Sequence, residues 1–324
     1  MSIGTRRVAS AVATALALQA TMVAAAVPGY PSRPVRVIVA LAPGGGTDIS
    51  ARLLAQKLAD AFGQSFVVDN RPGAGAMLGT ELAARATPDG YTLFVASPEF
   101  TVNPSLQPKA TYEPLRDFSP IVQMTSGQYF LSVRPGVAAA TVQELIALAR
   151  SQPRQLNYGS SGNGSANHLA GEMFRQMAGV DLTHVPYKGS GPAAAALMAG
   201  EIHVLFSSTT AVLQHVRSGR VRALAVTGAK RSPVAPEIPT VAESGVPGFE
   251  VTGWYGLLAP RGTPAAIIDV LSAAANRALP ELRSRFADLG SEVVAGTPAQ
   301  FAAFLRADQA RWAKVVKASG ARPD

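Results

Sequence analysis

Short apolar runs alternate with amphipathic helical stretches along most of this chain, and this alternation limits its fold more than any other feature. An apolar run at 35–40 is followed, after a glycine-rich break, by helical spacing of apolar residues over 49–62. Segments of this kind form β-strands of parallel sheets joined by crossover helices. We therefore predict an α/β fold.

The alternation occurs twice, which predicts two α/β lobes. Strands are expected in both units at 35–40, 66–68, 91–96, 156–159, 182–185, 202–206 and 223–227. Two more, at 121–124 and 130–133, are expected on either side of Ser126-Gly127, where we expect the chain to cross between lobes. A strand at 254–258 is expected to return to the first lobe. The predicted domains are the first part of lobe 1 at 30–127, lobe 2 at 128–251, and a return segment of lobe 1 at 252–324.

The amino terminus has the pattern of an export signal. Arg6 and Arg7 precede an alanine-rich apolar run, and Ala24 and Ala26 provide a small-residue cleavage site. The apolar run is too short and too interrupted by polar residues for a membrane anchor. We predict a signal peptide at 1–26, cleavage after Ala26, and an exported protein.

Composition excludes several classes of site. The 324 residues contain no cysteine, which excludes disulfides, thiolate nucleophiles and iron–sulfur clusters. The net charge is +8, but basic residues are scattered and aromatic residues make up only 6%, so no nucleic-acid surface is expected. The chain lacks a His-Glu-x-x-His helix and a Gly-x-Ser-x-Gly turn. We predict no catalytic residue, no metal site and no cofactor.

Two expected strands each end in a loop of glycine and hydroxyl residues that opens a helix. These loops lie at 43–48 and 160–165, and neither has the spacing of a P-loop or a dinucleotide-binding turn. Glycine lets backbone amides approach a ligand, and a helix amino terminus offers unpaired N–H groups with partial positive charge. Both loops therefore suit a carboxylate or phosphate, while Asp48 is expected to cap its helix.

Several longer motifs share one pattern. They are Ala42-Pro43-Gly44-Gly45-Gly46-Thr47-Asp48, Asn70-Arg71-Pro72-Gly73-Ala74-Gly75, Pro88-Asp89-Gly90-Tyr91-Thr92-Leu93, Tyr158-Gly159-Ser160-Ser161-Gly162 and His184-Val185-Pro186-Tyr187-Lys188-Gly189. With these motifs, spread over nearly the whole mature chain, the sequence resembles the receptors of tripartite tricarboxylate transporters, also called the Bug family.

The resemblance implies a periplasmic solute receptor with a type II-like binding-protein fold, in which two lobes close like a Venus flytrap on a ligand in the cleft between them. The receptor would capture a small organic carboxylate and deliver it to membrane transporter subunits. The implied carboxylate-binding residues are Pro43, Gly44, Gly45, Gly46, Thr47, Asp48, Ser160, Ser161, Gly162, Gly164 and Ser165.

The resemblance also implies positions that choose among ligands. These are Phe100, Thr101, Asn103, Ser208 and Thr209. Because Ser208 and Thr209 are neutral, we expect an organic acid without an ammonium group. A monomer is expected. Two alternatives stay open from the sequence: a secreted α/β enzyme, or a signalling ectodomain, acting on a small carboxylate.

Overall fold

The computed structural model describes residues 29–107 and 109–319, without the side chains of residues 210, 318 and 319. The predicted signal peptide and its cleavage site lie outside this part of the chain. Within it, no helix has both the length and the apolar character needed to cross a membrane.

A mixed sheet forms the centre of the first lobe. Its three parallel strands are β1 (Val35–Val39), β2 (Phe66–Asn70) and β3 (Thr92–Ala96). β9 (Thr252–Pro260) is antiparallel to β3, and β4 (Phe118–Val133) is antiparallel to β9. Chain segments far apart in sequence therefore share this sheet, and the return strand expected near 254–258 is confirmed.

A second mixed sheet forms the centre of the other lobe. β5 (Asn157–Ser160) pairs in parallel with β6 (Thr183–Pro186) and with β7 (Val204–Ser208). The last residues of β4 are antiparallel to β7 and to β8 (Arg222–Val226). The predicted parallel units are thus present. Each sheet also contains antiparallel strands, because β4 runs through both sheets and β9 enters the first sheet from the second lobe.

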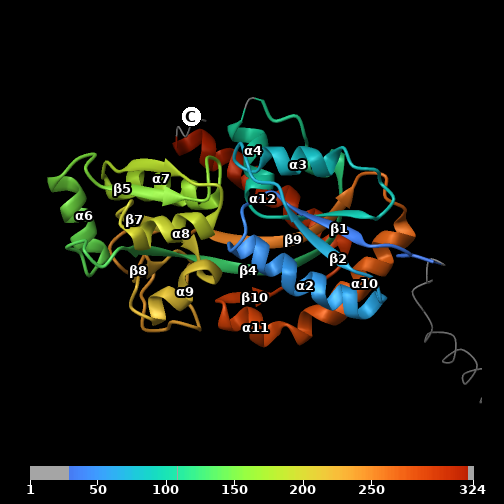
Figure 1. The fold of residues 1–324 in the computed structure, drawn as a ribbon. Coiled ribbons are helices and arrows are strands. Elements are labelled where there is room, and N and C mark those ends of the chain that lie inside the picture. Colours follow the sequence, from blue (N-terminus) through green and yellow to red (C-terminus); the bar gives the residue numbers. More distant parts are fainter. Residues whose placement is uncertain (1–28, 108, 320–324) are drawn as a thin grey trace, which may run out of the picture.

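β4 is one strand where the sequence predicted two. Ser126 and Gly127 are paired with Trp254 and Gly253 of β9 on one side, and with β10 (Ser291–Val293) on the other. Two partners hold this backbone extended, so the two expected strands are one continuous strand that passes between the sheets close to Ser126-Gly127. The partners of β4 change between Gln128 and Tyr129, from β9 to β7. In Figure 1, β4 and β9 run between the two halves of the molecule.

Helices cover both sheets (Figure 1). The first lobe carries α2 (Gly46–Phe62), α3 (Met77–Ala84), α4 (Glu99–Leu106), α5 (Pro114–Asp117), α10 (Ala265–Glu281) and α11 (Arg283–Asp288). The second carries α6 (Val142–Ser151), α7 (Ala166–Ala178), α8 (Ser190–Ala199) and α9 (Thr209–Arg217). The sequence did not predict α4, α5 or β10. α4 was missed because Pro98 and Pro104 resemble helix breakers, although Pro98 only precedes the helix.

The two lobes have separate hydrophobic cores, as expected for a two-lobed binding-protein fold. The core of the first lobe is built on β1, β3, α2 and α10. The second lobe has one cluster on β5, β7 and α7 and another on α8, α9 and the facing side of β7. The long α12 (Pro298–Ser319) joins both, since Phe301 packs in the first core and Trp312 in the second. The lobe boundaries at 127/128 and 251/252 stay predictions.

Candidate functional site

The amino-terminal ends of three helices meet between the lobes. A Cβ atom at Gly45, the N-cap of α2, would lie 3.5 Å from the backbone nitrogen of Ser190 in the first turn of α8. A Cβ atom at Gly46 would lie 2.8 Å from the hydroxyl of Ser208, the N-cap of α9, and would collide with the hydroxyl of Tyr255. Helix amino termini carry unpaired N–H groups and partial positive charge, so their convergence favours an anion.

A buried polar network adds α7 and α4 to this meeting point. The Ser161 hydroxyl oxygen lies 3.2 Å from Glu99 Oε1 and 3.2 Å from Asn167 Oδ1. Asn167 Nδ2 donates to the Phe206 carbonyl at 3.0 Å and to Ser190 Oγ at 3.3 Å. Because Asn167 lies in the first turn of α7 and Glu99 begins α4, the network extends from the first lobe to the start of α8.

The lobes are in direct contact around this network. The Ala42 N–H donates to the Lys188 carbonyl at 2.8 Å. Gly162 lies against the other lobe as well, since its Cβ position would be 3.7 Å from Gly75 Cα. The first loop therefore lies against the start of α8 and the second loop against Gly75 of the first lobe, at one interlobe contact.

Charged side chains hold the first loop in place. Asp48 accepts a hydrogen bond from the Gly44 N–H at 3.0 Å, an ion pair from Arg52 at 2.9 Å and a bond from Asn70 Nδ2 at 3.0 Å. Burial raises the pKa of Asp48, but the bonds from Arg52, Gly44 and Asn70 together lower it below its usual value. Asp48 thus fixes the turn before α2 as a charged carboxylate, although Gly45 occupies the N-cap position.

Neutral groups hold the second loop. Ser160 Oγ lies 2.7 Å from His184 Nε2 and accepts from the Gly162 N–H at 3.1 Å. The Gly164 N–H donates to His168 Nδ1 at 3.2 Å, and Ser165 caps α7 by accepting from the His168 N–H at 3.1 Å. Burial is the largest cause that lowers the pKa of His184 to about 3, and electrostatic interactions with His168 and Arg175 add to it. Ser160, Gly164 and Ser165 therefore shape the loop.

The structure brings some of the predicted ligand-choosing residues to the interlobe contact. Ser208 faces Gly46, and Asn103 Nδ2 donates to the Gly75 carbonyl at 2.7 Å. Asn103 also faces the second loop, because a Cβ atom at Gly164 would lie 2.5 Å from Asn103 Oδ1. Both side chains are thus placed where they can distinguish ligands.

Other predicted positions face away from the contact. Phe100 is buried in the first core and stacks on Tyr112 at 5.7 Å between ring centroids. Thr101 donates to Asp308 of α12 at 2.7 Å, and Thr209 donates to the carbonyl of Gln128 at 2.8 Å. The structure therefore does not gather Phe100, Thr101 and Thr209 with the loops.

Sequence reasoning missed three side chains of the site: Glu99, Asn167 and Tyr255. Asn167 and Tyr255 reach the site only through the tertiary fold. Glu99 did carry a signal, because it is an acid that closely follows an apolar strand, and the carboxyl ends of strands are where α/β folds bind ligands. It is only 3% exposed.

A cavity of about 340 Å³ adjoins the second loop. Its lining includes Ser161, Gly162 and Lys188, together with the 73–77 segment that precedes and begins α3. All four residues from Gly73 to Ala76 have positive φ angles, which curls this segment sharply at the edge of the cavity. A small carboxylate fits a space of this size.

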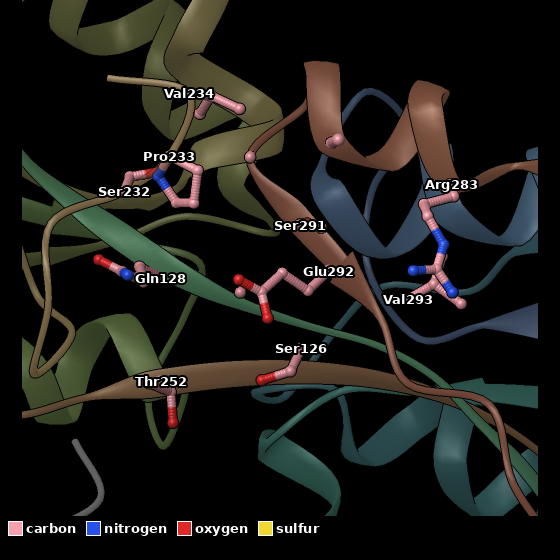
Figure 2. Close-up of a pocket in the computed structure, with 13 residues that line it drawn as sticks. Ser126, Gln128, Ser232, Pro233, Val234, Thr252, Arg283, Ser291, Glu292 and Val293 are labelled. Carbon is pink, nitrogen blue, oxygen red and sulfur yellow. The ribbon is translucent and has the colours of Figure 1, made fainter. Parts of the chain in front are cut away.

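Figure 2 shows a different cavity, of about 370 Å³, on the strands that connect the lobes. Gln128 of β4 and Glu292 of β10 contribute side chains to it, and Arg283 of α11 lies at its side. None of the predicted site residues lines it, and the helix amino termini of α2, α7, α8 and α9 are absent from its lining. The interlobe contact remains the candidate site.

Within the described ranges, no group of three or more His, Asp or Glu side chains is arranged to hold a metal ion. His168 and Glu172, one helical turn apart on α7, have other contacts. The His168 ring stacks on His184 at 4.2 Å, and Glu172 accepts from the Tyr158 hydroxyl at 2.6 Å.

Comparisons with known proteins agree with this geometry. The family described as tripartite tricarboxylate transporter family receptor matches residues 50–321. Protein BugT of Bordetella pertussis is 38% identical over 297 residues, which cover 90% of this chain and 91% of that protein.

Two solved structures share the fold closely. The structure of R. palustris Rpa4515 with adipate has 37% identity and a TM-score of 0.88, covering 91% of this chain and 100% of that one. MatC from Rhodopseudomonas palustris with bound malate has 35% identity and a TM-score of 0.85, covering 89% of this chain and 100% of that one.

Proposed function

The chain belongs to the tripartite tricarboxylate transporter receptor family, and from this membership we propose that it captures a small organic carboxylate between its lobes. It is a periplasmic solute receptor of the two-lobed binding-protein fold. We propose that the acid is released unchanged to membrane transporter subunits, without catalysis.

The convergence of four helix amino termini carries this proposal. The starts of α2, α7, α8 and α9 meet at the interlobe contact, and the Ser161 and Ser208 hydroxyls lie among them. The backbone N–H groups and the Ser208 hydroxyl, which has no partner among the described residues, can bind a carboxylate strongly, because hydrogen bonds to a charged acceptor are stronger than neutral ones. We propose loops 43–48 and 160–165 as the carboxylate clamp.

The ligand is proposed to be an organic acid without an ammonium group, such as a dicarboxylate. Ser208, at the site, is neutral, and two similar proteins are described with adipate and with malate. The positions proposed to choose the ligand are Asn103 and Ser208, because only these two of the five predicted positions face the loops.

Export and assembly complete the proposal. The first 26 residues would be removed after Ala26, which leaves a soluble monomer with lobes at 30–127 plus 252–324 and at 128–251. Intact mass of protein recovered from the periplasm tests the cleavage, and a species that retains residues 1–26 would contradict it.

A binding screen on refolded protein tests the proposed function. Unfolding and refolding strip any acid that co-purifies, after which adipate, malate, benzoate and aspartate are added separately. A ligand at a thousand times its dissociation constant should stabilise the native state by about 4 kcal/mol, which gives a clear rise in Tm. No rise with any of these acids, in a refolded and monodisperse sample, would contradict the carboxylate-receptor proposal.

A further inference from the structure

Glu99 is a buried acid at the candidate site. It begins α4, is 3% exposed, and contacts the second loop through Ser161. Its Oε2 atom is buried and has no hydrogen-bond partner among the described residues. A buried carboxylate without a counter-charge is costly, so its protonation state bears directly on which ligand fits beside it.

Counting hydrogens in the network assigns a proton to Glu99. Asn167 Nδ2 has two hydrogens, which go to the Phe206 carbonyl and Ser190 Oγ, so Asn167 Oδ1 must be an acceptor. Ser161 has one hydroxyl hydrogen, and donating it to Asn167 Oδ1 leaves none for the contact with Glu99 Oε1. That contact is then a hydrogen bond only if Glu99 is the donor, which requires the neutral acid.

The groups around Glu99 agree with this assignment. Tyr112, Tyr129 and Tyr255 interact with it electrostatically, and none of the three is a cation. Asp308 and Arg311 lie on α12, which packs against α4, and they pair with each other at 2.8 Å. Burial raises the pKa of Glu99 above its usual value and outweighs the hydrogen bonds with Ser97, with the Glu99 backbone and with Ser161, which lower it.

We infer that Glu99 is a neutral carboxylic acid when the lobes are closed on the ligand, so that it places no negative charge beside a bound anion and offers none to an ammonium group. This inference rests on the proposed function. An ionised Glu99 would repel an anion held at the helix amino termini, whereas the neutral form, whose one hydrogen goes to Ser161, removes that repulsion.

Closure of the lobes on a ligand couples binding to the protonation of Glu99. In an open cleft Glu99 is exposed to water and is ionised at neutral pH, because an unperturbed Glu has a pKa near 4.3. Closure over the ligand buries Glu99, which takes one proton from solvent and returns it on opening. Binding therefore takes up as much as one proton, and the dissociation constant rises with pH by up to tenfold per unit.

Calorimetry on the wild type measures this uptake without any substitution. The stronger ligand of adipate and malate is titrated at pH 7 in two buffers with different ionisation enthalpies, and its dissociation constant is measured from pH 6.5 to 8.5, where both acids are fully ionised. We expect uptake approaching one proton and a matching rise of the dissociation constant with pH.

Two variants identify the titrating group. Glu99→Gln keeps the shape and a donor but cannot ionise, so we expect no proton uptake and a pH-independent dissociation constant. Glu292→Gln, in the separate cavity of Figure 2, is the matched control and should keep the wild-type pH dependence.

Two results would overturn the inference while leaving the proposed function in place. One is binding of a dicarboxylate with no proton uptake and a dissociation constant that does not change with pH. The other is binding of aspartate that is tighter than that of the dicarboxylates and that Glu99→Gln weakens at least a hundredfold. Failure of the refolded wild type to bind any acid of the panel would instead contradict the proposed function itself, and this inference with it.

Discussion

The two glycine loops are similar in composition, but different chemistry holds each of them. Asp48, paired with Arg52 and Asn70, fixes the loop at 43–48. Contacts of His184 and His168 with loop atoms fix the loop at 160–165. An anion-binding loop thus needs only free backbone amides on its ligand side, and either an ion pair or neutral rings can support it from behind.

The comparison also explains why an acid next to the first loop does not repel an anion. The Asp48 oxygens are occupied by Gly44, Arg52 and Asn70, so the charge is neutralised behind the turn. In the second loop no charge needs balancing, and we infer that the nearby acid Glu99 is neutral. Both routes leave the helix amino termini free for a ligand.

The largest expected effect comes from filling the space between the loops. Gly45→Val adds two methyl groups where a Cβ atom already lies 3.5 Å from Ser190 N, so the lobes cannot close fully. We expect binding at least about a hundredfold weaker, roughly 2.7 kcal/mol, by titration calorimetry on the folded variant.

Gly136→Val is the matched control for this substitution. Gly136 is exposed, and nothing lies within 4 Å of its Cβ position, so the same change there should leave the ligand affinity as in the wild type. Wild-type affinity in Gly45→Val would show that the first loop does not contact the ligand.

Lowering the pH should weaken the contacts that hold the second loop before it weakens those that hold the first. The pKa of His184 is about 3 in the folded chain and near 6.5 when unfolded, so the unfolded state gains a proton below pH 6.5 that the folded state lacks. Stability from His184 therefore falls as pH drops, by about 2 kcal/mol between pH 7 and pH 5. Asp48 has a lowered pKa, so its contribution persists until the pH falls below about 4.

Urea unfolding at pH 7 and pH 5 measures this difference. The wild type should lose about 2 kcal/mol more than His184→Gln over this interval, because the variant has no imidazole to protonate at that position. Asp48→Asn, the control for the first loop, should lose as much as the wild type. Equal losses in the wild type and His184→Gln would show that His184 is not held neutral.

The smallest of these effects is the loss of one hydroxyl. Ser161→Ala removes the group between Glu99 and Asn167 and leaves Asn167 Oδ1 without its donor. We expect about tenfold weaker binding, roughly 1.4 kcal/mol, with the fold intact. Ser126→Ala, in the cavity of Figure 2, is the control and should bind as the wild type does. Weaker binding in Ser126→Ala alone would move the site to that cavity.

Local patterns predicted most of the fold and the loops of the site. Strands such as β1 and the glycine loop before α2 follow from apolar runs, turn residues and helical spacing that lie within a few residues of each other. The strands expected at 121–124 and 130–133 are one strand because pairing with β9 and β10, distant in sequence, holds the backbone at Ser126-Gly127 extended.

The rest of the site could not be predicted because tertiary packing assembles it. Glu99 is one acid between a proline and a phenylalanine, and only the approach of Ser161, 62 residues further along, turns it into part of a network. Phe100 was expected at the ligand, but the helical turn of α4 directs it into the core. The sequence shows which residues follow the end of a strand. The position of each residue around the helix then decides which side chains face the cleft.

A crystal structure of the refolded protein with its strongest-binding acid tests the central claim most directly. We expect one carboxylate of the ligand within hydrogen-bond distance of backbone N–H groups from both 43–48 and 160–165, with the lobes closed around it. A ligand bound in the cavity of Figure 2, or held by only one of the two loops, would contradict the proposed clamp.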